Sequence, residues 1–445
     1  MKKLAAHQRR IAAMMDDMPF LGIFAEAGTG KTMIALSWIY DHLVKGDIEN
    51  ALVVCPAALI PSWKRAIRRM VEFGYSDLDV SIMNENVMIT SYQKIWRPNG
   101  TYRGYKQYKL RDEIDHPWDA VFVDESHRLG DPKSVQTKQA LKLALLCSRR
   151  YIMTGTPDSS NYMKLYGQLK FLDPSIWDNV REFDRKYVIA HNYFNKPISF
   201  DTERLEMLKK SYGTVVRLRD CFDMPSENEV DLPIELTEKG VYHDFINNNV
   251  SNYGFDVTVA GIGSQKALQV CSGFYLDADG MQHRLSTQKL DALTEIIDGS
   301  DDKIAVYCRF IASLDMIEER LKKHNVSYHR FDGSTKEPVW EDFQSDDTKV
   351  ILVQYQRGSE GIDLFAANRM VFYEPTQSAL QLEQAKARIM RKGQERPCVY
   401  YHMFCEGTVE ERTMNSVRNG VDVSRQMLDN WSQEERERAK NVKTQ

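Results

Sequence analysis

A glycine-rich segment near the N-terminus has the residue types that can cradle a phosphate group. Residues 25–32 read Ala-Glu-Ala-Gly-Thr-Gly-Lys-Thr, which fits the phosphate loop GxxxxGK[ST] except that Ala25 replaces the first glycine. The lysine can place its charge on the β- and γ-oxygens, and the last threonine can offer a hydroxyl to Mg²⁺ at a helix N-terminus. We therefore expect an ATP–Mg²⁺ site rather than a turn without a ligand. Its residues are Gly28, Thr29, Gly30, Lys31 and Thr32.

A second segment supplies the carboxylates that such a site needs. Residues 120–127 read Ala-Val-Phe-Val-Asp-Glu-Ser-His, an apolar run that ends in two acids. Asp124 can hold Mg²⁺ through water, and Glu125 can orient and deprotonate the water that attacks the γ-phosphate. The alternative for this segment alone is an acidic surface turn. The two motifs together favour ATP hydrolysis.

Hydrolysis also needs positively charged side chains next to the transferred phosphate in the transition state. Arg388 and Arg391 are three residues apart, so a helix over residues 384–391 would present both guanidinium groups on one face. An arginine finger of this kind raises the rate by about 10³- to 10⁵-fold. Because this segment belongs to the C-terminal half, we expect the nucleotide to lie between two domains. The alternative is a basic, exposed helix face.

Short apolar runs that alternate with helical patterns must position these residues. The runs end in Gly, Pro, Ser, Thr or acidic residues, which is typical of buried parallel strands. We predict the fold class α/β, with two doubly wound parallel sheets. The predicted strands are 21–25, 51–55, 87–90, 120–123 and 151–153 in the first domain, and 303–310, 327–331, 350–354, 370–373 and 399–404 in the second.

The predicted domains are residues 1–230 and 231–430, followed by a charged tail at 431–445. Residues 158–300 show no strand alternation. We interpret them as helical insertions, at 160–230 in the first domain and at 237–290 in the second.

The composition excludes several classes of protein. The chain has 445 residues, 42% of them hydrophobic, and a formal net charge of −4, so bulk electrostatic wrapping of nucleic acid is not expected. No apolar run reaches the roughly 18 residues that a membrane span needs. The seven cysteines are scattered without a CxxC pair, which argues against a zinc site or a disulfide framework. We expect a cytoplasmic protein that makes no membrane contact.

Taken in order, these and further motifs resemble those of superfamily 2 helicases, and within them the Swi/Snf-type DNA-dependent ATPases. The resemblance extends from about residue 4 to 412, and Asp-Gly-Ser-Thr at residues 332–335 is characteristic of that branch. Three departures are Ile389-Met390 in place of Ala-His, Asp363 in place of Asn, and Ser126 in the acidic box. The matching segments are Gln8, 53–63, 89–92, 120–127, 153–157, 215–219, 331–335, 358–364 and 388–394.

The resemblance implies two RecA-like domains and assigns roles that spacing alone does not reveal. Gln8 would recognise the adenine, and Gly361 and Asp363 would contact the nucleotide from the second domain. Segment 153–157 would couple the ATP site to DNA.

The resemblance also implies that a DNA backbone lies across both domains. Thr90, Ser91 and Thr154 stand at predicted strand ends, where hydroxyl groups can bind phosphates and fix the register without reading sequence. The basic residues within 64–69 could add charge there, or could form a solvated helix face.

Residues 96–109 hold four cations, four aromatic residues and no acid. Asn99-Gly100 is a strong two-residue turn signal, so we predict a β-hairpin. Aromatic side chains between cations can stack on bases while the cations hold phosphates. The hypothesis is a hairpin that touches branched DNA, and the alternative is a loop without function. The expected DNA contacts are Trp96, Arg97, Arg103 and Lys106.

We therefore predict an ATP-dependent DNA translocase or helicase that remodels duplex or branched DNA in replication, recombination or repair, as a compact motor of viral or bacterial origin. One alternative is a strand-separating helicase that acts on forks. An alternative of another class is a nucleotide-gated DNA-binding protein without turnover. The presence of Lys31, Asp124, Glu125 and Arg391 favours an enzyme.

Overall fold

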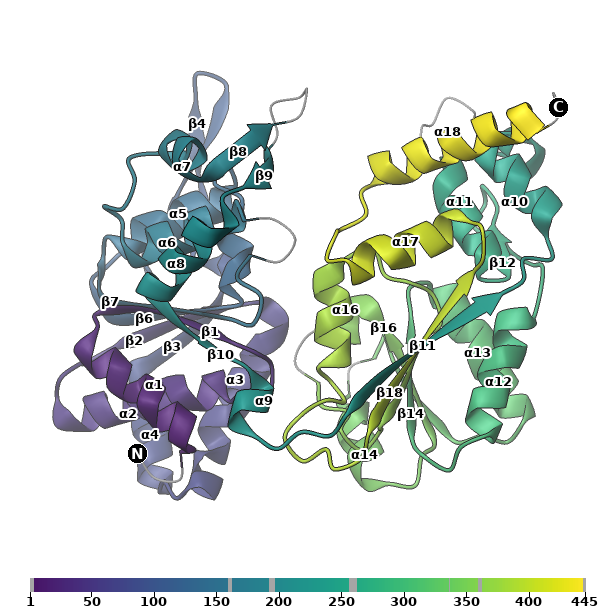
Figure 1. The fold of residues 1–445 in the computed structure, drawn as a ribbon. Coiled ribbons are helices and arrows are strands. Elements are labelled where there is room, and N and C mark those ends of the chain that lie inside the picture. Colours follow the sequence, from purple (N-terminus) through teal and green to yellow (C-terminus); the bar gives the residue numbers. More distant parts are fainter. Residues whose placement is uncertain are drawn as a thin grey trace. The chain divides into compact units, whose positions relative to one another are not determined.

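The computed structural model describes residues 4–158, 162–191, 197–255, 262–335, 337–358 and 362–442. The chain divides into two compact units, residues 1–223 and 224–445, which are described here one at a time (Figure 1). The boundary predicted after residue 230 falls inside a strand of the second unit.

A six-stranded parallel sheet forms the centre of unit 1, in the order β10-β1-β7-β6-β2-β3. Its inner strands are buried on both faces, which explains why they read as continuous apolar runs. All five predicted strands of this unit are confirmed. The strands of the sheet are β1 (Phe20–Ala25), β2 (Ala51–Cys55), β3 (Val87–Ser91), β6 (Trp118–Asp124), β7 (Cys147–Thr154) and β10 (Gly213–Val216).

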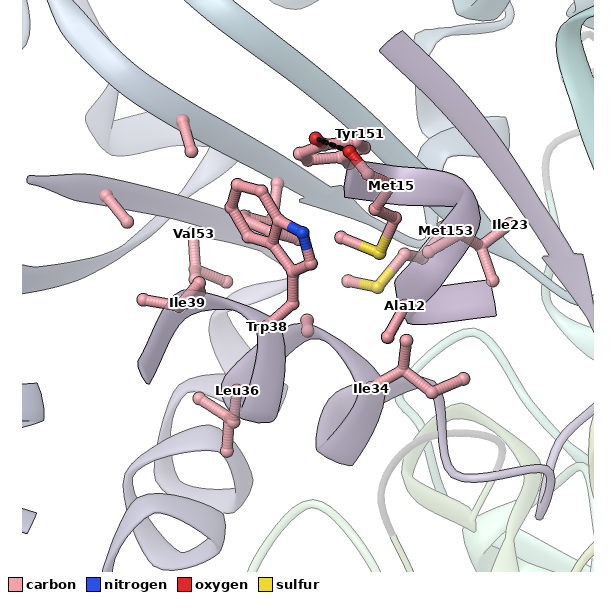
Figure 2. Close-up of a cluster of buried hydrophobic side chains, with 14 of the residues drawn as sticks. Ala12, Met15, Ile23, Ile34, Leu36, Trp38, Ile39, Val53, Tyr151 and Met153 are labelled. Atoms are coloured by element: carbon pink, nitrogen blue, oxygen red, sulfur yellow. Dashed lines mark hydrogen bonds between the residues drawn. The ribbon is translucent and has the colours of Figure 1, made fainter. Parts of the chain in front are cut away.

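Helices cover both faces of this sheet. On one face, Met15 of α1 and Trp38 of α2 pack with Ile23 and Met153 of the strands (Figure 2). The Tyr151 hydroxyl donates to the carbonyl oxygen of Met15 at 2.9 Å, which ties α1 to β7. The helices are α1 (Ala6–Asp17), α2 (Lys31–Lys45), α3 (Ile60–Arg68), α4 (Asp77–Asn86), α5 (Val135–Ala144), α6 (Lys164–Leu172), α7 (Val180–Tyr187), α8 (Thr202–Tyr212) and α9 (Leu218–Cys221), with 3-10 turns η1 (Ala57–Leu59), η2 (Arg69–Phe73), η3 (Tyr92–Lys94) and η4 (Ser126–Leu129).

Two antiparallel hairpins complete unit 1. The first pairs β4 (Trp96–Tyr102) with β5 (Tyr105–Leu110), and the second pairs β8 (Val188–His191) with β9 (Pro197–Phe200). The first hairpin projects from the body of the unit in Figure 1.

Unit 2 repeats the plan with the parallel strand order β11-β18-β17-β14-β16-β15. The five predicted strands are again confirmed, and the fold class is α/β with two RecA-like sheets. A short antiparallel pair, β12 (Phe274–Leu276) and β13 (Gln282–Arg284), stands apart from the sheet. The sheet strands are β11 (Glu227–Ile234), β14 (Ile304–Cys308), β15 (Tyr328–Phe331), β16 (Val350–Gln354), β17 (Arg369–Phe372) and β18 (Cys398–Cys405).

The C-terminal helix α18 packs on the helical part of unit 2. Tyr242 of α10 donates to Glu435 at 3.0 Å, and Ser264 of α11 donates to Asp429 at 2.5 Å. No helix of the described part of the chain is long and apolar enough to cross a membrane. The helices are α10 (Lys239–Ile246), α11 (Ile262–Cys271), α12 (Gln288–Asp298), α13 (Ile311–Lys323), α14 (Val339–Ser345), α15 (Tyr355–Gly358), α16 (Ala379–Lys386), α17 (Val409–Arg418) and α18 (Arg425–Val442), with the 3-10 turn η5 (Val250–Tyr253).

The prediction that residues 158–300 contain helices without strands is wrong. Two hairpins lie there, and so do the sheet strands β10 and β11. β11 pairs only with β18 among the sheet strands, and its polar side chains alternate with partly buried ones. An edge strand of this kind lacks the continuous apolar run used to find the others.

Candidate active site

The phosphate loop joins the end of β1 to the start of α2. Gly28 and Gly30 have φ angles of 85° and 84°, a left-handed conformation that suits glycine. A Cβ on Gly30 would also lie 2.1 Å from Nε2 of Gln8, so a larger residue would be strained at this φ and would displace the Gln8 side chain. The Thr29 side chain is buried, and its hydroxyl donates to the Glu26 carbonyl at 2.7 Å.

Lys31 folds back into this loop. Its Nζ donates to the carbonyl oxygens of Ala25 at 2.6 Å and Glu26 at 3.2 Å. The Glu26 carboxylate in turn accepts from the Leu218 N–H at 2.8 Å, so the start of α9 helps to hold the loop. The ammonium group therefore sits at the carboxyl end of β1, where a parallel sheet offers its ligand site.

Gln8 lies against the same loop from α1. Its Nε2 donates to the Thr29 carbonyl at 3.1 Å, and its Oε1 accepts from the Ala5 N–H at 2.9 Å. His7 Nε2 is 2.9 Å from the same Thr29 carbonyl. The predicted adenine-recognising residue is thus placed beside the predicted phosphate-binding residues.

Asp124 ends β6 and is almost fully buried. Its Oδ2 accepts from Trp63 Nε1 at 2.9 Å, and its Oδ1 accepts from the Glu125 N–H at 2.9 Å. Burial and the negative charge of Glu125 raise the pKa of Asp124 to about 6, while the charge of Lys31 acts in the opposite direction. The positive charge of Lys31 therefore favours the ionised Asp124 carboxylate.

Glu125 is held by its backbone and by a histidine. Its φ of 50° is unusual for a residue with a side chain, and strain of this kind gathers at functional sites. The Tyr92 hydroxyl donates to the carbonyl oxygens of Asp124 at 2.7 Å and Glu125 at 3.1 Å. His127 Nδ1 lies 3.3 Å from the Glu125 carboxylate and 3.1 Å from the Thr154 hydroxyl. The acidic box is therefore connected to the end of β7.

This donor set fits a magnesium nucleotide. A carboxylate with a raised pKa, buried beside a second acid, has unmet demand for positive charge, which a divalent cation supplies. Thr32, in the first turn of α2, has the hydroxyl that Mg²⁺ accepts as a ligand.

The predicted helix that presents both arginines is wrong. α16 ends at Lys386, and Arg388 and Arg391 lie in the turns that follow. They still converge, because their guanidinium groups donate to the Ile362 carbonyl at 3.2 and 3.1 Å. Arg388 also donates to the Gln384 carbonyl at 3.0 Å. Hydrogen bonds to backbone carbonyls, and not a helix, therefore hold the two guanidinium groups together.

Asp363 forms an ion pair with Arg391. Burial lowers the pKa of Arg391 to about 10, which leaves the group charged at neutral pH. Gly361, the other residue expected to contact the nucleotide from this unit, lies outside the described residues.

Comparison with known proteins places this geometry in a family. Residues 15–239, about half of the chain, match the SNF2-related domain. The chain belongs to the SNF2-related family of superfamily 2 helicases. Residues 288–393 match the helicase conserved C-terminal domain, so both units contain a recognised part of such a helicase.

Relatives of this SNF2-related chain include the DNA repair and recombination protein RAD54-like of Drosophila grimshawi, with 23% identity, and that of Drosophila ananassae, with 21%. Each alignment covers 91% of this chain and 59% of the relative, so the chain spans about three-fifths of their length. A solved structure, the Sulfolobus solfataricus SWI2/SNF2 ATPase core in complex with dsDNA, is 20% identical with a TM-score of 0.43 and covers 93% of this chain and 90% of its own.

Three predicted DNA contacts of the SNF2-related unit are buried, whereas the basic residues near them are more exposed. Thr90 and Ser91, at the end of β3, are buried, and so is Thr154. The Thr154 hydroxyl is near His127 and accepts from the Thr156 N–H at 3.2 Å, so it orders the loop after β7. On α3, Trp63 and Ile67 point inward as expected, and the basic side chains of residues 64–69 lie outside them.

The predicted hairpin over residues 96–109 is confirmed, but the turn is misplaced. Asn99 and Gly100 lie at a bulge within β4, and the turn is Arg103-Gly104, whose φ angles are 49° and 81°. Two positive φ angles in sequence give the primed turn that suits a two-residue hairpin.

The position of Trp96 also corrects the prediction. It stands at the base of the hairpin, where its ring packs edge-on against Tyr108 at 5.1 Å and contacts the hydrophobic core. Arg97 beside it is paired with Asp112 at 2.5 Å. Arg103 and Lys106, in contrast, are exposed near the turn. Trp96 is therefore not placed to stack on a base.

Sequence reasoning did not assign roles to Trp63, Tyr92 and His127. All three stand inside segments that matched family motifs, and His127 closes the acidic box itself. The signal available in the sequence was the place of each residue inside a matching motif; the proximity of Trp63 and Tyr92 to Asp124 appears only in the structure. Trp63 Nε1 and the Tyr92 hydroxyl show why it matters, since each bonds the acidic box directly.

Proposed function

We propose that this chain hydrolyses ATP with Mg²⁺ and couples hydrolysis to movement along duplex or branched DNA during repair, recombination or replication. The observation that carries the proposal is the placement of Lys31 in the phosphate loop after β1 and of the buried Asp124 at the end of β6, two strands of the same parallel sheet. Membership of the SNF2-related family and relatives named as DNA repair and recombination proteins support DNA as the track.

In this proposal each residue of unit 1 has a separate task. Lys31 leaves the loop carbonyls to bind the phosphate chain, and Thr32 and Asp124 hold Mg²⁺. Bound there, Mg²⁺ would supply positive charge next to the phosphate oxygens on which negative charge builds. Glu125 orients the attacking water and takes its proton, and its carboxylate is kept in place by His127.

The remaining nucleotide contacts are also proposals. Gln8 recognises the adenine while Gly28, Thr29 and Gly30 surround the phosphates. From unit 2, Arg388 and Arg391 stabilise the transferred phosphoryl group, and Gly361 and Asp363 assist them. The hydrogen bonds that both arginines make to the Ile362 carbonyl support a shared role.

The DNA track is proposed to be read through its phosphates. The strand ends that carry Thr90, Ser91 and Thr154 face the backbone, the exposed basic side chains of residues 64–69 add charge beside these buried hydroxyl groups, and sequence contributes little to affinity. None of the seven cysteines, which all lie within the described residues, forms a disulfide. This is consistent with a reducing compartment, so we propose that the protein acts in the cytoplasm.

Displacement of a third DNA strand tests the motor function. A translocase that moves on duplex DNA should strip a triplex-forming strand from a blunt duplex in the presence of ATP, with no separation of the duplex itself. The matched control is Lys31→Ala, which should bind DNA but displace nothing. Displacement by Lys31→Ala at the wild-type rate would contradict the proposed site. Separation of fork strands without triplex displacement would instead identify a strand-separating helicase.

A further inference from the structure

The β4–β5 hairpin is anchored at its base. Leu110 is buried in the core, and the Tyr108 carbonyl accepts from Gln139 Nε2 of α5 at 3.2 Å. The Arg111 N–H bonds the Ile95 carbonyl at 3.1 Å, which closes the strand pair below Trp96. The hairpin is thus fixed at one end to the body of unit 1, and its other end projects from that body (Figure 1).

Its tip carries two exposed aromatic rings. Tyr102 and Tyr105 are directly opposite each other across the turn, and their exposed fractions are 62% and 75%. Among the exposed large hydrophobic side chains in the described part of unit 1, these two are the aromatic ones, and they form a cross-strand pair. The guanidinium of Arg103 lies 5.4 Å from the centre of the Tyr102 ring.

The charge of the tip is positive. Arg97 and Lys109 near the base share one carboxylate, Asp112, which offsets part of their charge. Arg103 and Lys106 at the tip form no ion pair with any carboxylate of the described residues. Exposed rings flanked by uncompensated cations match a ligand that combines flat apolar faces with negative charge, and nucleotides of a single strand have both.

We propose that Tyr102 and Tyr105 stack on unpaired bases at a branch or single-stranded arm of DNA, while Arg103 and Lys106 hold the adjoining phosphates. The inference rests on the proposed function, because it gives the motor a contact that duplex DNA cannot satisfy. Bases inside a duplex are stacked on each other, so the rings find a free face only where a strand is open. The hairpin then directs the motor to branched DNA.

The test compares binding of the full chain to two probes, a blunt duplex and a fork of the same duplex length with single-stranded arms. The double variant Tyr102→Ala/Tyr105→Ala should bind the fork about fivefold or more weakly, and the blunt duplex about as well as wild type. Tyr102→Phe/Tyr105→Phe keeps both rings and should retain fork binding. Leu145→Ala, at another exposed apolar residue of the same unit, is the matched control.

A spectroscopic reading separates stacking from other contacts. Fluorescence of 2-aminopurine placed at the branch should be quenched by wild type and by the Phe variant, and not by the Ala variant. Equal loss of affinity on both probes would overturn the proposal in favour of a general phosphate contact, and unchanged fork binding would overturn it outright. Loss in the Phe variant equal to that in the Ala variant would identify a hydroxyl contact instead. Duplex-stimulated ATP hydrolysis is measured in parallel, and its absence in wild type would refute the proposed function without deciding the role of the hairpin.

Discussion

Removal of the hydrogen bond from Trp63 to Asp124 should move the pH dependence of ATP hydrolysis to higher pH. Trp63→Phe keeps an aromatic ring in the buried position but removes Nε1, which donates to Asp124 at 2.9 Å. That hydrogen bond holds the pKa of Asp124 down against burial and the charge of Glu125. Without it, the acid should become harder to ionise, and only the ionised form can bind Mg²⁺.

The magnitude follows from the strength of such bonds. A hydrogen bond to a charged group contributes about 1.5 to 3 kcal/mol, which corresponds to about 1 to 2 pKa units. The pKa of Asp124, raised to about 6 in the wild type, would therefore rise to between about 7 and 8. At pH 7 the ionised fraction would fall from about nine-tenths to between about one-half and one-tenth. Asp124 is active as the ionised carboxylate, which predominates above its pKa. Activity of the variant should therefore be lost as pH falls through the raised pKa.

The assay is kcat/KM for ATP measured from pH 5.5 to 9.5, because that ratio reports the pKa values of the free enzyme. Trp63→Phe should show about a two- to tenfold loss at pH 7 that recovers at high pH. Trp38→Phe is the matched control, since Trp38 is equally buried and its Nε1 donates to Asp16 at 2.8 Å, outside the site. An unshifted profile in Trp63→Phe, or the same shift in Trp38→Phe, would refute the reasoning.

Two further predictions concern the second unit and the DNA track. Arg391→Ala should lower kcat by about 10³-fold with little change in KM, because the charge of Arg391 acts in the transition state. The control is Arg396→Ala, which removes an arginine paired with Asp302 and should leave kcat unchanged. A change in KM alone would contradict the role of Arg391. The logarithm of the DNA-binding constant should fall linearly with the logarithm of the salt concentration. Each phosphate contacted should add about −0.9 to the slope, and two unrelated duplexes should give the same slope. A flat plot, or a strong preference for one duplex, would contradict contact through phosphates.

The sheet strands that position the site could be predicted because buried parallel strands are apolar from end to end. Ala51–Cys55 and Val350–Gln354 each read as one short hydrophobic run and each became a central strand. β10 and β11 were missed because neither reads as a continuous buried apolar run: β10 has four residues of which one is buried, and β11 alternates polar with partly buried side chains. At the opposite sides of the two sheets, the edge strand β3 is more apolar, and both β3 and the edge strand β15 could be predicted.

Local signals failed where a longer-range contact determined the conformation. Asn99-Gly100 is a stronger turn signal than Arg103-Gly104, but the pairing of Trp96 with Leu110 sets a register that puts the turn at the latter. Arg388 and Arg391 have helical spacing, but their hydrogen bonds to the Ile362 carbonyl stabilise a turn instead. In both cases the deciding partner is distant in sequence, and residue spacing carries no information about it.

The central claim is that DNA-stimulated ATP hydrolysis takes place at the site built from the phosphate loop and the acidic box. Steady-state hydrolysis of ATP with and without duplex DNA, compared between wild type and Glu125→Gln, tests it most directly, with Glu113→Gln as a control at an exposed glutamate of the same unit. The account predicts that DNA raises the wild-type rate, that Glu113→Gln behaves as wild type, and that Glu125→Gln binds ATP but does not turn it over. Near-normal turnover by Glu125→Gln, or a wild-type rate that DNA does not change, would contradict the account.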